Sequence, residues 1–207
     1  MPSLLSVIRT ILAALVLTAI GQQLLLHVGA SYSTLNFFSY FTNLSNLFAA
    51  FVLLLSVFAS SSQQSSLNAM RYVSAVNMAV VGIVFVVLLR NVDLGALLPW
   101  VNFTLHYVMP VAIVLDWLFQ PPHSRLKAKH LGLALVFPAA YLFYVLLRGV
   151  AMGWYPYPFL NPANLGGYGG VAVYSAGIFV TFLVVGSALL AAGNRLARAA
   201  SSEAPSV

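Results

Sequence analysis

Residues 98–119 read Leu98-Pro-Trp-Val-Asn-Phe-Thr-Leu-His106-Tyr-Val-Met-Pro-Val-Ala-Ile-Val-Leu-Asp-Trp-Leu-Phe119, an almost unbroken apolar run with a histidine near its middle. A helix of about 20 such residues crosses the ~30 Å hydrocarbon core of a membrane. An ionisable side chain inside that core is costly unless it faces a cavity or a partner. The stretch therefore predicts a membrane-spanning helix in which His106 belongs to a functional site.

Other stretches of the chain are also long and apolar enough to cross a membrane. In all, the expected spans are Ser6–His27, Phe37–Ala59, Met70–Arg90, Leu98–Phe119, His130–Arg148 and Gly170–Gly193. The 207-residue sequence is 61% hydrophobic and only 6% charged, which argues against a soluble domain. Such segments are too long for β-barrel strands, so the predicted fold class is all-α, a polytopic bundle of six transmembrane helices. We expect one domain over residues 1–198 and a disordered cytoplasmic tail over residues 199–207.

Basic residues are distributed unequally between the two sides of this bundle. Two of them, Arg90 and Arg148, fall on one side, and seven fall on the other: Arg9, Arg71, Arg125, Lys127, Lys129, Arg195 and Arg198. Connections rich in Lys and Arg stay in the cytoplasm, so we expect both termini there. The net charge of +6 then reflects topology and contact with anionic membrane lipids, not nucleic-acid binding. Nothing in the pattern indicates an obligate protein partner.

Thr42, in the second expected span, is the best partner for His106. Counted from the same side, Thr42 lies six residues into its span and His106 eight, which is about 9 and about 12 Å at the helical rise. A hydroxyl and an imidazole at similar depth are the minimum parts of a nucleophile and its general base. Asn102, one turn from His106, can orient the ring, and Pro110 frees the carbonyl of His106 and should kink the helix.

The connection over residues 153–170 is rich in Pro, Gly and aromatic residues, and we expect it to fold back onto the bundle. It is either an interfacial aromatic anchor or a lid over a cavity. No metal or other cofactor is expected, because His123 and His130 fall on the cytoplasmic side, far from His106. Asp116 lies ten residues beyond His106, about 15 Å along the axis, and is expected to be a structural carboxylate paired with Arg or Lys.

Three groups of residues carry a family resemblance. They are Trp100-x-Asn102-x-x-x-His106 with an acidic residue ten positions after the histidine, Phe41-Thr42, and Trp154 with Tyr157-Pro-Phe-Leu160. Together they resemble the androgen-induced protein family of integral membrane hydrolases, relatives of the androgen-dependent regulator of tissue factor pathway inhibitor, in its bacterial branch. The chain differs from the animal members in the position of Pro110 and in the run Asn43-Leu-Ser-Asn46.

The resemblance implies an intramembrane threonine hydrolase that cleaves lipid esters such as fatty acid esters of hydroxy fatty acids, with Thr42 and His106 as its catalytic dyad. The expected mechanism passes through an acyl-enzyme. Asn43, Asn46 and Asn102 are the candidate oxyanion or orienting residues. Candidate substrate-binding residues are Ser39, Arg90, Trp100, Arg148 and Tyr157. The expected location is the bacterial inner membrane, and the alternative function is a lipid-binding receptor or transporter that uses the same polar cavity without chemistry.

Overall fold

The computed structural model describes residues 3–58, 64–92 and 97–202, and in these residues it contains helices and no strands. Six helical segments among them are long and apolar enough to span a membrane, which confirms the predicted all-α bundle. The segments are α1 (Leu4–Gly29), α3 (Phe41–Phe58), α4 with η2 (Gln64–Val84, Phe85–Leu89), the fourth span α5–η3–α6 (Pro99–Phe103, Thr104–Val108, Met109–Phe119), α7 (Lys129–Met152) and α8 (Tyr168–Ser202).

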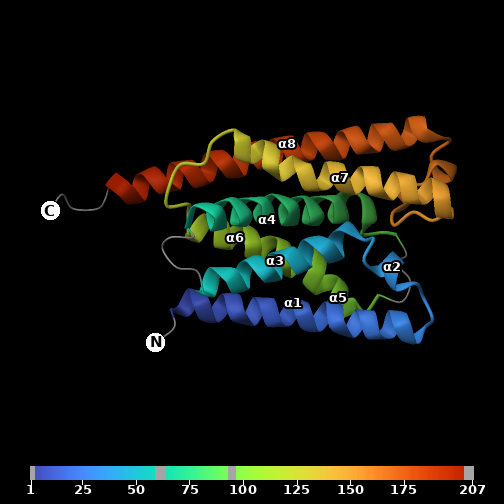
Figure 1. Ribbon diagram of the computed structural model, residues 1–207, viewed down its shortest axis with the longest axis horizontal. Helices are drawn as coiled ribbons and strands as arrows, with labels where there is room; N and C mark the ends of the chain where they lie inside the picture. Colours follow the sequence, from blue (N-terminus) through green and yellow to red (C-terminus); the bar gives the residue numbers. More distant parts are fainter. Residues whose placement is uncertain (1–2, 59–63, 93–96, 203–207) are drawn as a thin grey trace.

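The spans are arranged around α4, which packs against α3, α6, α7 and α8, while α1 packs against α3 (Figure 1). α7 and α8 lie side by side and bury the smallest share of their residues among the six spans, as expected for helices that face lipid. The chain enters α1 and leaves α8 at the same end of the bundle. The short helix α2 (Thr34–Phe37) and the α7–α8 loop lie at the opposite end, which we call the loop end.

The second span begins later than its sequence predicts. Instead of one helix from Phe37, the chain forms α2, breaks at residues 38–40, and starts α3 at Phe41. The hydroxyl of Ser39 donates to the carbonyl of Leu35, so local hydrogen bonds replace the continuing helix. Thr42 consequently lies in the first turn of α3, close to the positive end of its dipole.

The last helix is longer than expected. α8 continues to Ser202, so the predicted boundary between domain and tail at residue 198 falls inside this helix. Residues 203–207 of the expected tail lie outside the described residues.

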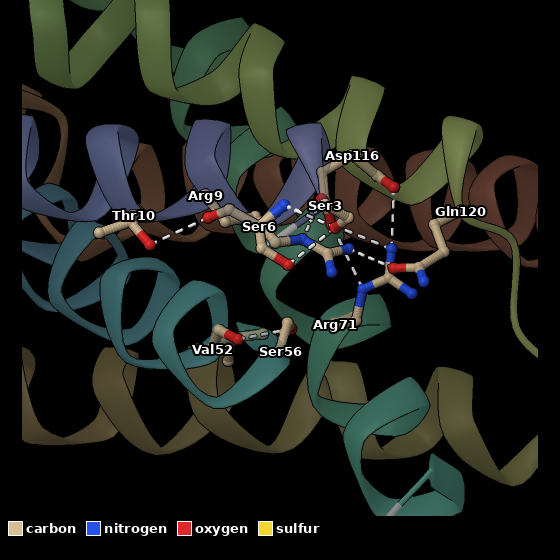
Figure 2. Close-up of polar contacts among 9 residues, drawn as sticks. All are labelled: Ser3, Ser6, Arg9, Thr10, Val52, Ser56, Arg71, Asp116 and Gln120. Atoms are coloured by element: carbon tan, nitrogen blue, oxygen red, sulfur yellow. Dashed lines mark hydrogen bonds and ion pairs between the residues drawn. The ribbon is translucent and has the colours of Figure 1, made fainter. Parts of the chain in front are cut away.

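A buried ionic cluster joins three helices at the end opposite the loop end (Figure 2). Asp116 on α6 accepts from Arg9 Nε of α1 at 2.6 Å and from Arg71 Nη2 of α4 at 2.9 Å. Arg9 also donates to Gln120, one helical turn beyond Asp116. Asp116 is therefore a structural carboxylate paired with arginine, as predicted, and it ties α1, α4 and α6 together.

Candidate active site

Thr42 and His106 meet inside the bundle near the loop end. Thr42 Oγ1 lies 3.3 Å from His106 Nε2, and both side chains are buried, with 7% of each residue exposed. The two residues come from α3 and from η3 of the fourth span, which are packed together. The contact that the sequence predicted from depth is therefore present, although the second span starts later than expected.

The orientation of the imidazole fixes which nitrogen can act as the base. His106 Nδ1 lies 3.1 Å from the backbone carbonyl of Asn102, which can only accept a hydrogen bond. Nδ1 therefore carries the proton, and Nε2 presents its lone pair to the hydroxyl of Thr42. Phe85 stacks on the ring with centroids 4.1 Å apart and planes 20° apart, which fixes its plane. The contribution of Phe85 could not be inferred from the sequence, where it is one apolar residue among many.

Two π-helical segments bring these rings together. In η3, the N–H of Met109 bonds to the carbonyl of Thr104 five residues earlier, directly before Pro110, which has no N–H to offer. In η2, the N–H of Arg90 bonds to the carbonyl of Phe85 at 2.8 Å. Each π segment inserts an extra residue into its helix and rotates the side chains before it, and such bulges occur frequently at functional sites. The kink predicted at Pro110 stays a prediction, and the structure adds a π segment that ends two residues before this proline.

The α7–α8 loop reaches the nucleophile through Tyr157, which lies just before a short 3-10 turn, η4 (Pro158–Leu160). Tyr157 Oη accepts a hydrogen bond from the backbone N–H of Thr42 at 3.3 Å and lies 3.5 Å from Thr42 Oγ1. Its ring stacks on Phe159 at 5.1 Å, and only 8% of the residue is exposed. Burial raises the pKa of Tyr157, so the phenol stays protonated and able to donate. The sequence indicated Tyr157 as a substrate contact but not its place beside Thr42.

A cavity of about 500 Å³, which we call the vestibule, lies next to the pair at the loop end. Thr42 and His106 line it together with residues of α1, α2 and the α7–α8 loop. Its polar lining includes Gln23, Asn36, Asn43, Asn161 and Asn164. The candidate nucleophile and base are therefore accessible from a partly polar space, although they lie within an apolar bundle.

The candidate substrate-binding residues divide into two groups. Tyr157 lines the vestibule, and Arg148 lies beside it, because its guanidinium donates to Asn36 Oδ1 and lies 5.0 Å from the ring centroid of Trp154. Asn36 and Trp154 both line the vestibule. The residues that line it do not include Ser39, Arg90 or Trp100.

The three candidate oxyanion amides are placed differently. Asn46 gives its side-chain N–H groups to the backbone carbonyls of Thr42 and Leu105, so neither is left for a substrate. Asn43 lines the vestibule and donates one N–H to a carbonyl of α2, which leaves one N–H for a ligand. Asn102 contacts His106 through its backbone carbonyl, whereas its side chain does not line the vestibule.

Among the described residues, no group of three or more histidine, aspartate or glutamate side chains lies close enough to hold a metal ion. No curated protein and no solved structure matches the sequence. The model of a protein family described as FAR-17a/AIG1-like protein matches residues 8–191, a range that includes every residue of the site. This match confirms the resemblance to the androgen-induced protein family, and we conclude that the chain belongs to the FAR-17a/AIG1-like family.

Proposed function

We propose that this protein is an intramembrane threonine hydrolase that cleaves lipid esters, such as fatty acid esters of hydroxy fatty acids. The observation that carries the proposal is the contact of 3.3 Å between Thr42 Oγ1 and the unprotonated Nε2 of His106 beside the vestibule. A hydroxyl becomes an effective nucleophile when a base is placed to take its proton. The chain belongs to the FAR-17a/AIG1-like family, and its resemblance to the integral membrane hydrolases of the androgen-induced protein family supports the same function.

Each step of the reaction uses a group already in place. Thr42 Oγ1 attacks the ester carbonyl carbon, and its proton moves to His106 Nε2. The tetrahedral intermediate collapses, the bond to the alcohol oxygen breaks, and His106 returns the proton to that oxygen. Water from the vestibule then loses a proton to His106 as it attacks the acyl carbon. The bond from that carbon to Thr42 Oγ1 breaks, His106 returns the proton to Oγ1, and the acid is released. The carbonyl of Asn102 stabilises the imidazolium that forms in both halves of the reaction.

Negative charge develops on the carbonyl oxygen during both attacks, and two side-chain donors lie near it. They are the hydroxyl of Tyr157, which is 3.5 Å from Thr42 Oγ1, and the remaining N–H of Asn43. Donors that are already oriented before reaction stabilise such an oxyanion at no cost of reorganisation. Arg148, beside the vestibule, would favour a substrate whose polar part carries a carboxylate.

The sequence features also support a location. The seven-to-two distribution of basic residues supports an orientation with both termini in the cytoplasm and the vestibule on the outer side of the membrane. This orientation and the six spans support the proposed location in a bacterial inner membrane.

The test is hydrolysis of a panel of lipid esters by the purified wild-type protein and by Thr42→Ala. We expect turnover and labelling by a fluorophosphonate probe in the wild type, and neither in Thr42→Ala. Thr181→Ala serves as the control, because this exposed hydroxyl bonds only within α8. If Thr42→Ala hydrolysed the esters as fast as the wild type, Thr42 would not be the nucleophile. Lipid binding without turnover or labelling in the wild type would favour the receptor or transporter.

A further inference from the structure

A second cavity, of about 230 Å³, lies between α7, α8 and the ends of α3 and α4, and we call it the lateral cleft. Its lining is almost wholly apolar. On α7 and α8 its apolar lining is formed by Pro138, Ala139, Leu142, Ile178, Phe179 and Phe182, and the two helices add the hydroxyl-bearing residues Tyr141 and Ser175. Charged side chains are missing from this lining, so the cleft suits hydrocarbon and gives a polar group almost nothing to bond with.

The lateral cleft and the vestibule meet at the nucleophile. Thr42, Leu89 and Tyr157 line both cavities. Thr42 therefore has a partly polar space on one side and an almost wholly apolar space on the other. A single ester molecule with its carbonyl at Thr42 would extend one arm into each.

The cleft is also open to the surface of the bundle that faces lipid. Phe179, on its α8 wall, is 48% exposed, and Ala139, on its α7 wall, is exposed as well. α7 and α8 are the two most exposed spans, so the surface between them contacts the bilayer. A hydrocarbon chain can move from the membrane into the cleft without crossing water, which conserves its hydrophobic stabilisation.

We propose that the lateral cleft is the acyl-chain subsite, which an unsubstituted fatty acyl chain enters from the bilayer between α7 and α8. This inference rests on the proposed function. The order of the reaction decides which arm of the ester lies there. The acyl chain stays bound to Thr42 while the alcohol leaves and water arrives, and both need the polar vestibule. The acyl chain must therefore occupy the other space, and the oxygenated alcohol part lies in the vestibule.

In the first test, the substitution Ala139→Phe narrows the lateral cleft, and Ala140→Phe is the control. Both alanines are exposed on α7, but only Ala139 lines the cleft. With esters of one alcohol, Ala139→Phe should lower kcat/KM for a palmitoyl ester by at least about tenfold, the effect of a small change of volume in an apolar pocket. Its activity on the acetyl ester should stay within about twofold of wild type, and Ala140→Phe should change neither. An equal loss on both esters, or none on either, would overturn the subsite.

A second test does not depend on turnover. Thr42→Ala, in vesicles that contain a diazirine-bearing palmitic acid, should be photolabelled on α7 and α8 beside the cleft. Adding Ala139→Phe should remove that labelling, whereas adding Ala140→Phe should leave it. If the wild-type protein hydrolyses no ester but this labelling pattern appears, the proposed chemistry fails and the hydrocarbon site stands. If hydrolysis depends on Thr42 but labelling ignores Ala139→Phe, the chemistry stands and the subsite fails.

Discussion

A threonine hydroxyl is a weak nucleophile, and at the scale of single residues its neighbours decide whether it can react. His106 Nε2 is placed to accept its proton, and the carbonyl of Asn102 fixes which nitrogen is free to do so. The hydroxyl oxygen of Tyr157 lies 3.5 Å from Thr42 Oγ1 and accepts a hydrogen bond from the backbone N–H of Thr42. The site thus combines a nucleophile, a base and a donor from three separate segments of the chain.

Tyr157→Phe tests the donor, because it removes one hydroxyl and keeps the stacking on Phe159. Loss of one oxyanion donor typically costs about 10²–10³ in rate, so we expect kcat to fall by about 100-fold with little change in KM. Burial holds the pKa of Tyr157 above its ordinary value of 10.0, and only the neutral phenol donates, so its ionisation should not lower kcat below about pH 10. Tyr168→Phe, which alters an exposed hydroxyl of the same region, is the control. An unchanged kcat in Tyr157→Phe would assign the oxyanion to Asn43.

Asn102→Leu separates the backbone of this residue from its side chain. The carbonyl that holds His106 remains in the variant, and the lost Oδ1 is buried without a partner among the described residues. We therefore expect kcat within about threefold of wild type and a melting temperature that does not fall, because an unsatisfied buried polar group is itself destabilising. Steady-state kinetics and thermal unfolding measure both quantities. A loss of kcat near 100-fold would mean that the amide enters the site during the reaction.

At the scale of elements, the close approach of α4 to the fourth span holds Phe85 against His106. A Cβ atom added at Gly82 would lie 3.0 Å from Cβ of Pro110, so any other residue would require the two helices to separate by a few tenths of an ångström. Gly82 lies three residues before Phe85, on the same stretch of α4 that faces η3. The two π segments and this glycine together define the distance between the two rings.

Gly82→Val should therefore push the fourth span away from α4. Overpacking of this kind costs about 1–3 kcal/mol, and we expect a lower melting temperature together with a lower kcat as the stacking on His106 loosens. Gly177→Val is the matched control, because nothing lies within 4 Å of a Cβ atom at that glycine of α8. If Gly82→Val had the same melting temperature and kcat as Gly177→Val, the stacking of Phe85 on His106 would not depend on the contact between Gly82 and Pro110.

The spans could be predicted because their signal is simple: each needs about 20 apolar residues in succession, whatever surrounds it. The break before α3 could not be predicted, because Phe37 and Phe38 resemble the apolar start of a span. The hydrogen bond from the Ser39 hydroxyl that accompanies the break is not visible in the sequence pattern. The pairing of Thr42 with His106 was predictable from depth and family resemblance. The positions of Phe85 and Tyr157 were not, because they depend on tertiary packing around two π segments.

At the scale of the whole molecule, the candidate active site and the ionic cluster lie at opposite ends of the bundle. The pair of Thr42 and His106 lies near the loop end, and the cluster around Asp116 lies at the other end, about 15 Å from His106 along the fourth span. Asp116 holds two arginines of other helices, so it stabilises the arrangement of α1, α4 and α6 without contacting the site.

Asp116→Asn should leave Arg9 and Arg71 buried without a counter-charge. Removing one partner from such a buried cluster costs about 3–5 kcal/mol, so we expect a marked fall in melting temperature. The protein that remains folded should keep its kcat, because the site lies at the other end. Thermal unfolding and kinetics below the transition measure the two effects. A normal melting temperature with a lost kcat would instead give Asp116 a role in the reaction.

The orientation of the whole molecule decides from which side of the membrane the vestibule is reached. Basic residues gather at the end where α1 begins and α8 ends, so that end should face the cytoplasm and the vestibule should face outward. The chain contains no cysteine, so single cysteines report sidedness without background. In intact cells, a membrane-impermeant maleimide should label Asn164→Cys, in the α7–α8 loop, and should label Ser124→Cys, between α6 and α7, only after lysis. The opposite pattern would place the vestibule in the cytoplasm, and substrates and water would then reach Thr42 from inside the cell.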